Sequence, residues 1–137
     1  MWGQQRLYNR SPFKGRMKAT STHFVLEKGS DYKDIAPVFK DILTMLLEDI
    51  EQVPEDEEIM GMFIEQNLSD LMNNRKPEGY NRKGRIRLVF PMDRKEFYLK
   101  TYSKNADLAG LSDRISAVLK EGGVKFSMLQ NDNMDFE

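Results

Sequence analysis

The stretch that decides the fold is residues 84–103, GRIRLVFPMDRKEFYLKTYS. It is typical of two strands, residues 85–90 and 96–102, joined by a turn at residues 91–94. Because side chains alternate between the two faces of a strand, an apolar set separates from a basic, aromatic set. The apolar set is Ile86, Leu88, Phe90, Phe97, Leu99 and Thr101. The opposite set is Arg85, Arg87, Val89, Tyr98, Lys100 and Tyr102.

The remaining chain supplies two more strands and three helices. Residues 22–28 form a first strand, and apolar residues at helical spacing predict helices over residues 35–53 and 55–72, the first with Asp34 as its N-cap. A third helix begins after a cap at Asn105 or Asp107 and ends at Gly122-Gly123, and residues 124–129 form a last strand.

This order predicts an α+β fold of the ferredoxin-like, split β-α-β type, with an extra helix in the first crossover. Right-handed crossovers place the first and third strands at the centre of a four-stranded antiparallel sheet. The helices then cover one face. The other face is open unless the extra helix lies across it. We expect a basic N-terminal arm at residues 1–20, one domain at residues 21–129 and an acidic C-terminal tail at residues 130–137.

Composition narrows the class of protein. The chain of 137 residues suits one domain with a sizeable core, and it has no cysteine for disulfides, thiol catalysis or cysteine metal sites. No apolar run approaches the roughly 20 residues that cross a bilayer, and no secretory signal is visible. We therefore expect a cytoplasmic protein.

Charge is distributed unevenly, although the formal net charge is only −1. Residues 1–26 hold five cations and no acid, residues 48–58 are strongly acidic, and residues 75–87 are basic with Glu78 as the only acid. Local patches, not the overall field, are therefore expected to attract a polyanion.

The basic, aromatic face predicts binding of single-stranded nucleic acid, because rings stack on bases and cations neutralise phosphates. The alternative is an ordinary solvent-facing sheet, in which tyrosine pairs with long cations across the strands. The predicted binding residues are Arg85, Arg87, Tyr98, Lys100, Tyr102 and Lys125 on the sheet, with Arg75, Lys76, Arg82 and Lys83 in the preceding loop.

The layout is similar to that of RNA-recognition-motif domains, which share this strand and helix order and an aromatic sheet face. The resemblance covers residues 22–129 and is one of topology. That family's third-strand signature has glycine where this chain has Glu96, and the paired helices of the first crossover are foreign to it.

A rival hypothesis is an interaction or assembly protein, a role compatible with a viral or phage accessory protein. The N-terminal arm would then dock on a protein partner or on a second copy through Trp2, Tyr8 and Phe13. Aromatic residues with arginine are also frequent at protein interfaces.

Signals of catalysis are weak, so we expect a non-catalytic protein without cofactor or metal. His23 is the single histidine, and its neighbours Ser21 and Thr22 lack an identifiable third partner for a catalytic triad. The carboxylates of residues 55–58 fit the start of a helix, where they complement its dipole. Gly122-Gly123 lacks the phosphate-loop pattern.

Overall fold

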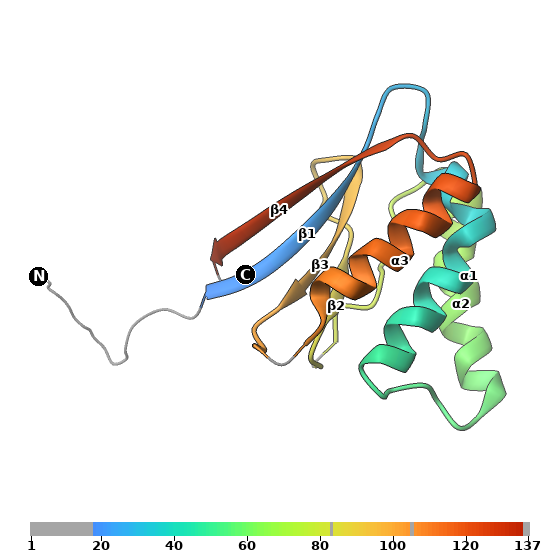
Figure 1. The fold of residues 1–137 in the computed structure, drawn as a ribbon. Helices are drawn as coiled ribbons and strands as arrows, with labels where there is room; N and C mark the ends of the chain where they lie inside the picture. Colours follow the sequence, from blue (N-terminus) through green and yellow to red (C-terminus); the bar gives the residue numbers. More distant parts are fainter. Residues whose placement is uncertain (1–17, 83, 105, 136–137) are drawn as a thin grey trace, which may run out of the picture.

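The computed structural model describes residues 18–82, 84–104 and 106–135 and shows an α+β fold (Figure 1). Four strands form one antiparallel sheet, and three helices accompany it, as predicted. In chain order the elements are β1 (Lys18–Leu26), α1 (Tyr32–Asp49), α2 (Glu57–Met72), β2 (Arg87–Val89), β3 (Glu96–Thr101), α3 (Leu108–Glu121) and β4 (Phe126–Asp135).

The sheet order is β2-β3-β1-β4, so the first and third strands are central, and this ferredoxin-like arrangement confirms the prediction. The register of the central pair places Phe24 opposite Phe97 and His23 opposite Tyr98. Neighbouring positions point to opposite faces, so the phenylalanines lie on one face and His23 and Tyr98 on the other.

All three helices lie on the same side of the sheet, and α2 packs against α1 (Figure 1). The extra helix of the first crossover therefore does not cross the other face. On the helix side, the rings of Phe24 and Phe97 stack with centroids 4.8 Å apart. Phe24, Phe39, Leu46 and Leu99 have no exposed surface, which is the burial expected for a main core.

Helix starts follow capping chemistry. The helix α1 begins earlier than predicted, because Asp31 is its N-cap and the Asp34 carboxylate accepts a hydrogen bond from the Asp31 amide at 2.7 Å. This reciprocal capping box satisfies backbone donors that would otherwise be free. In α3 the cap is Asp107, whose Oδ1 accepts from the Gly110 amide at 2.9 Å.

The first and last strands extend beyond their predicted bounds. β4 runs to Asp135, beyond the expected end at residue 129, so most of the predicted acidic tail continues the sheet. β1 begins at Lys18, inside the predicted arm, and pairs with β4 along this extension. Each strand supplies the other's backbone hydrogen bonds, which outweighs the low strand propensity of the Asn and Asp residues.

Candidate nucleic-acid interface

The sheet face away from the helices carries a second, small hydrophobic cluster. Ala19 and Tyr98 are buried there, and Val89 and Tyr102 pack against them, partly buried. Tyr98 is only 2% exposed, and Lys100 is 3% exposed, although both were expected to face a ligand. They lie on the central strand β3, between β1 and β2. In this conformation neither side chain offers a surface that a base or phosphate could reach.

The same face holds three hydrogen-bonded side chains, a trio whose grouping could not be predicted from the sequence. Ser21 Oγ lies 2.8 Å from His23 Nε2, and His23 Nδ1 lies 2.7 Å from Glu96 Oε1. Glu96 is thus the third partner that sequence reasoning lacked, contributed by the neighbouring strand β3. However, Ser21 is fully buried, so its hydroxyl is not accessible to a substrate. The trio joins β1 to β3 across the sheet.

The basic loop between α2 and β2 is fastened along the β2 edge. Gly79 has a φ of +77°, and its amide donates to Asn67 Oδ1 at 2.7 Å. Asn67 is itself held, because its Nδ2 donates to the Phe63 carbonyl at 2.8 Å. One residue further on, Tyr80 exchanges two backbone hydrogen bonds with Leu88 of β2. The loop therefore presents its side chains from a fixed backbone.

A hollow of about 350 Å³ lies between this loop, α2 and the end of β2. Its wall includes Lys76 and Arg82 as cations and Glu78 as an acid. The Arg82 guanidinium lies 4.7 Å from the centroid of the Phe63 ring and 5.7 Å from that of Tyr80. This stack holds a planar cation against two rings at the rim of the hollow.

A second, shallower hollow of about 460 Å³ lies beside the first. Its wall includes Arg85 and Tyr102, together with Gln52 from the segment after α1. The Tyr80 hydroxyl donates to Gln52 Oε1 at 2.8 Å, so residues of the two hollows are directly joined. Arg85 also donates to the Asp49 carbonyl at 2.6 Å, which anchors its head group at the end of α1.

The structure therefore divides the predicted binding residues. Lys76 and Arg82 line the first hollow, and Arg85 and Tyr102 line the second. Arg87 is half-buried in β2 and lines neither hollow. Phe63 and Gln52 were missed, because their sequence positions fit a helix stripe and a connecting segment and gave no separate signal.

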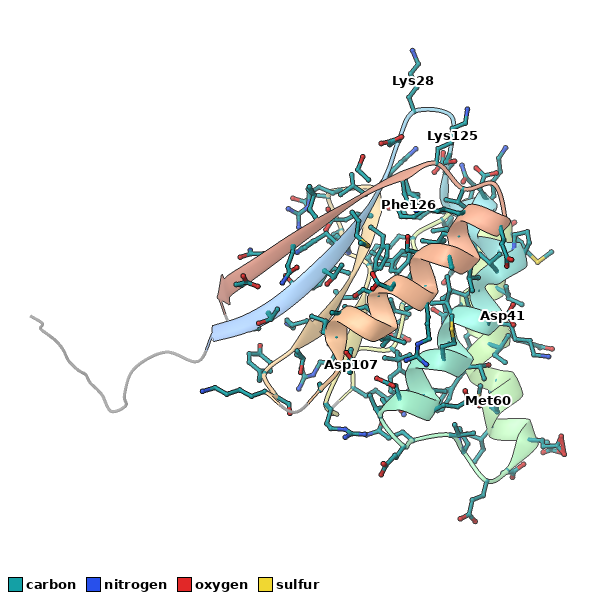
Figure 2. The ribbon with its side chains drawn as sticks, in the orientation of Figure 1. Lys28, Asp41, Met60, Asp107, Lys125 and Phe126 are labelled. Atoms are coloured by element: carbon teal, nitrogen blue, oxygen red, sulfur yellow. The ribbon has the colours of Figure 1, made fainter. Side chains whose placement is uncertain are left out.

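The other predicted residues lie elsewhere. Arg75 is exposed and pairs with Asp70 at 3.2 Å. Lys125 lies near Lys28 at the end of the sheet where β1 ends and β3 begins (Figure 2). Arg85 lies at the opposite end of β3, near Thr101. Four predicted residues fall outside the described part of the chain, namely Lys83, Trp2, Tyr8 and Phe13.

Comparisons of the chain with protein-family models, with curated proteins and with solved structures found no match. Within residues 18–82, 84–104 and 106–135, no helix has the length and apolar character needed to span a bilayer. In the same described ranges, no three histidine, aspartate or glutamate residues converge as metal ligands.

Proposed function

We propose that the protein binds single-stranded nucleic acid along the β2 edge of its sheet, through the two adjacent hollows. The observation that carries the proposal is the Arg82 guanidinium, which is stacked on Phe63 and exposed to solvent. A nucleic-acid base can stack on an arginine plane as it does on an aromatic ring. The aromatic rings behind Arg82 keep that plane in position.

Local charge supports the same surface. Residues 75–87 contain six cations and one acid, a local charge of +5 in a chain whose net charge is −1. The rest of the chain therefore carries −6. A phosphate backbone is therefore attracted to the basic segment and repelled by the acidic residues 48–58.

The hollows suit a strand more than a duplex. The first hollow offers the exposed Arg82 plane, which the buried Tyr80 supports from behind, and the second offers the half-buried ring of Tyr102 beside Arg85. Alternating rings and cations are the pattern by which single strands are held without sequence preference. The buried Tyr98 and Lys100 contribute to the sheet and are not part of this proposed contact surface.

The test is a fluorescence anisotropy titration with labelled single-stranded DNA and RNA of roughly 16 nucleotides. We expect binding that weakens steeply between about 50 and about 200 mM salt, because phosphate contacts release counterions. Arg82→Ala should weaken binding at least about fivefold, the equivalent of ~1 kcal/mol for one stacked base.

Arg75→Ala is the matched control, since it removes the same charge from an exposed site paired with Asp70, outside both hollows. It should weaken binding less than Arg82→Ala does. Circular dichroism of both variants checks that each is folded. Absence of binding by the unmodified protein at low salt would refute the proposal. An equal loss of affinity in the two variants would show that Arg82 is not the central contact.

A further inference from the structure

The strand β4 lies at the edge of the described sheet, opposite β2 (Figure 1). It is ten residues long, whereas β2 at the other edge has three and is partly covered by the loop at Tyr80. Natural proteins usually protect edge strands by shortening them or by adding proline or lysine. β4 contains neither proline nor lysine, and its two aspartates and its register shift lie beyond residue 131, so residues 126–131 lack these protective features. It is therefore competent to pair with a further strand.

The side chains of β4 are also unusually accessible for a strand. Leu129 is 59% exposed and Met128 is 44% exposed, on opposite faces of the ribbon. Both belong to residues 126–131, which are uncharged and pair regularly with β1 before the register shifts opposite Ala19 and Ser21. An uncharged, regular segment with apolar side chains favours strand addition.

The charges around this segment match a second copy of the same chain. Lys125 comes immediately before β4, and the acidic residues Asp132 and Asp135 lie near its far end. Antiparallel pairing of two copies brings the basic start of one strand beside the acidic end of the other, twice. A parallel arrangement would place like charges together, which costs stability.

We propose that two copies of the chain pair through their β4 edges, antiparallel and about a two-fold axis at Leu129. In this register Leu129 faces its own counterpart, Met128 faces Gln130, and Ser127 faces Asn131. The exposed Leu129 side chain is thereby covered by its copy. The result is a continuous eight-stranded sheet, and the two β2 edges remain at its outer ends.

Cysteine crosslinking tests the register, because the natural chain has no cysteine and each variant carries a single thiol. In the proposed dimer, Leu129→Cys places two thiols on directly opposite residues, with Cβ atoms about 5 Å apart. Ser127→Cys and Asn131→Cys place their own copies four residues apart along the strand, roughly 13 Å. A disulfide cannot span the latter distance.

The expected result is a disulfide dimer that forms under mild oxidation with Leu129→Cys and at least tenfold less with the two flanking variants. Equal crosslinking of all three, or preferential crosslinking at residue 127 or 131, would overturn the two-fold register. The fraction of disulfide dimer is measured for each full-length variant by non-reducing electrophoresis.

Sedimentation of the full chain at increasing concentration tests the pairing itself. The unmodified protein should shift from monomer to dimer, and Leu129→Lys should remain monomeric, because two lysines would face each other. Met62→Lys is the matched control, since Met62 is 56% exposed on α2, away from the β4 edge. A monomer at every concentration, or equal loss of dimer in both lysine variants, would overturn the proposal.

Discussion

His23 of β1 and Glu96 of β3 are joined across the sheet, with Nδ1 and Oε1 2.7 Å apart. Both side chains are largely buried, at 14% and 6% exposure. Because a carboxylate only accepts hydrogen bonds, Nδ1 carries the proton, and in the neutral ring Nε2 then accepts from the Ser21 hydroxyl. The pair therefore fixes both the ring orientation and the alignment of the two central strands.

Removal of His23 should reveal how much the His23–Glu96 pair contributes to stability. We expect His23→Ala to lower the free energy of unfolding by about 1–3 kcal/mol, because the buried Glu96 would keep only the longer contact with Arg94 at 3.9 Å. Replacement of both residues by valine should restore part of the loss, since the buried carboxylate is then gone and only the Ser21 hydroxyl has lost its partner. Urea denaturation of the single and double variants measures both effects.

Asp93→Asn provides the comparison for a surface pair. Asp93 is 83% exposed and lies 3.7 Å from Arg94, so its loss should change stability by less than about 0.5 kcal/mol. An equal effect of the two single variants would contradict the importance assigned to the buried pair.

The cap of α1 predicts a specific pH dependence. The hydrogen bond from Lys95 lowers the pKa of Asp31 to about 2. The unfolded pKa is near 3.9, so this stabilisation is fully present above about pH 4 and is lost as the pH falls toward 2. Asp31→Asn keeps a capping side chain without the charge. Its deficit relative to the unmodified protein should therefore shrink between about pH 4 and about pH 2.

Lys95→Met should reduce the same pH dependence, because it deletes the main donor to Asp31 and leaves the weaker hydrogen bonds from the Tyr32 amide and Asn74 in place. Chemical denaturation at several pH values between about 2 and 7 records both variants. A deficit that is constant across this range would show that the ion pair makes no contribution to folding.

Two glycines should respond in opposite directions to alanine. At Gly79, φ is +77° and an added Cβ would lie 2.5 Å from the Leu88 carbonyl oxygen. Gly79→Ala should therefore cost more than about 1 kcal/mol and release the Tyr80–Leu88 bridge. Faster hydrogen exchange at the amides of Tyr80 and Leu88 would report that release.

Gly61 lies inside α2 with no atom within 4 Å of an added Cβ. Gly61→Ala should raise stability by about 0.5–1 kcal/mol, because alanine loses less backbone freedom in a helix. Thermal denaturation of the two alanine variants gives the comparison. A stabilised Gly79→Ala would contradict the described loop.

Arg87 is expected to lower the stability of the fold and to contribute to oligonucleotide binding. Its Nε is buried without a hydrogen-bond partner in the described structure. Arg87→Met keeps the apolar stem and removes this polar group, so the free energy of unfolding should stay unchanged or rise by about 1 kcal/mol. Under the proposed function, oligonucleotide affinity should fall in the same variant, as anisotropy would show. A clear loss of stability would contradict the burial of an unsatisfied group.

Much of the fold follows from local periodicity. The two-residue alternation around Leu88, Phe97 and Leu99 identifies the core face, and all three are buried as that alternation requires. Helical spacing identifies all three helices, and the handedness of crossovers yields the strand order. Boundaries were less predictable: β2 has three residues, not six, and α1 starts at Tyr32.

The candidate site depended on contacts between distant segments. Arg82 was selected from the sequence as a cation, but its stack on Phe63 of α2 follows only from the path of the loop fastened by Asn67. Likewise, the burial of Tyr98 depends on Ala19 from another strand. Neither arrangement has a periodic signature within one segment.

The sequence by itself determined which residues form strands and helices, and which face of the hairpin enters the core, because these properties depend on neighbours a few positions away. Only the tertiary structure decided that the basic, aromatic character is accessible at the β2 edge and largely buried on central β3. Exposure is set by side chains that other strands and loops bring into contact, and those contacts are fixed when the sheet assembles.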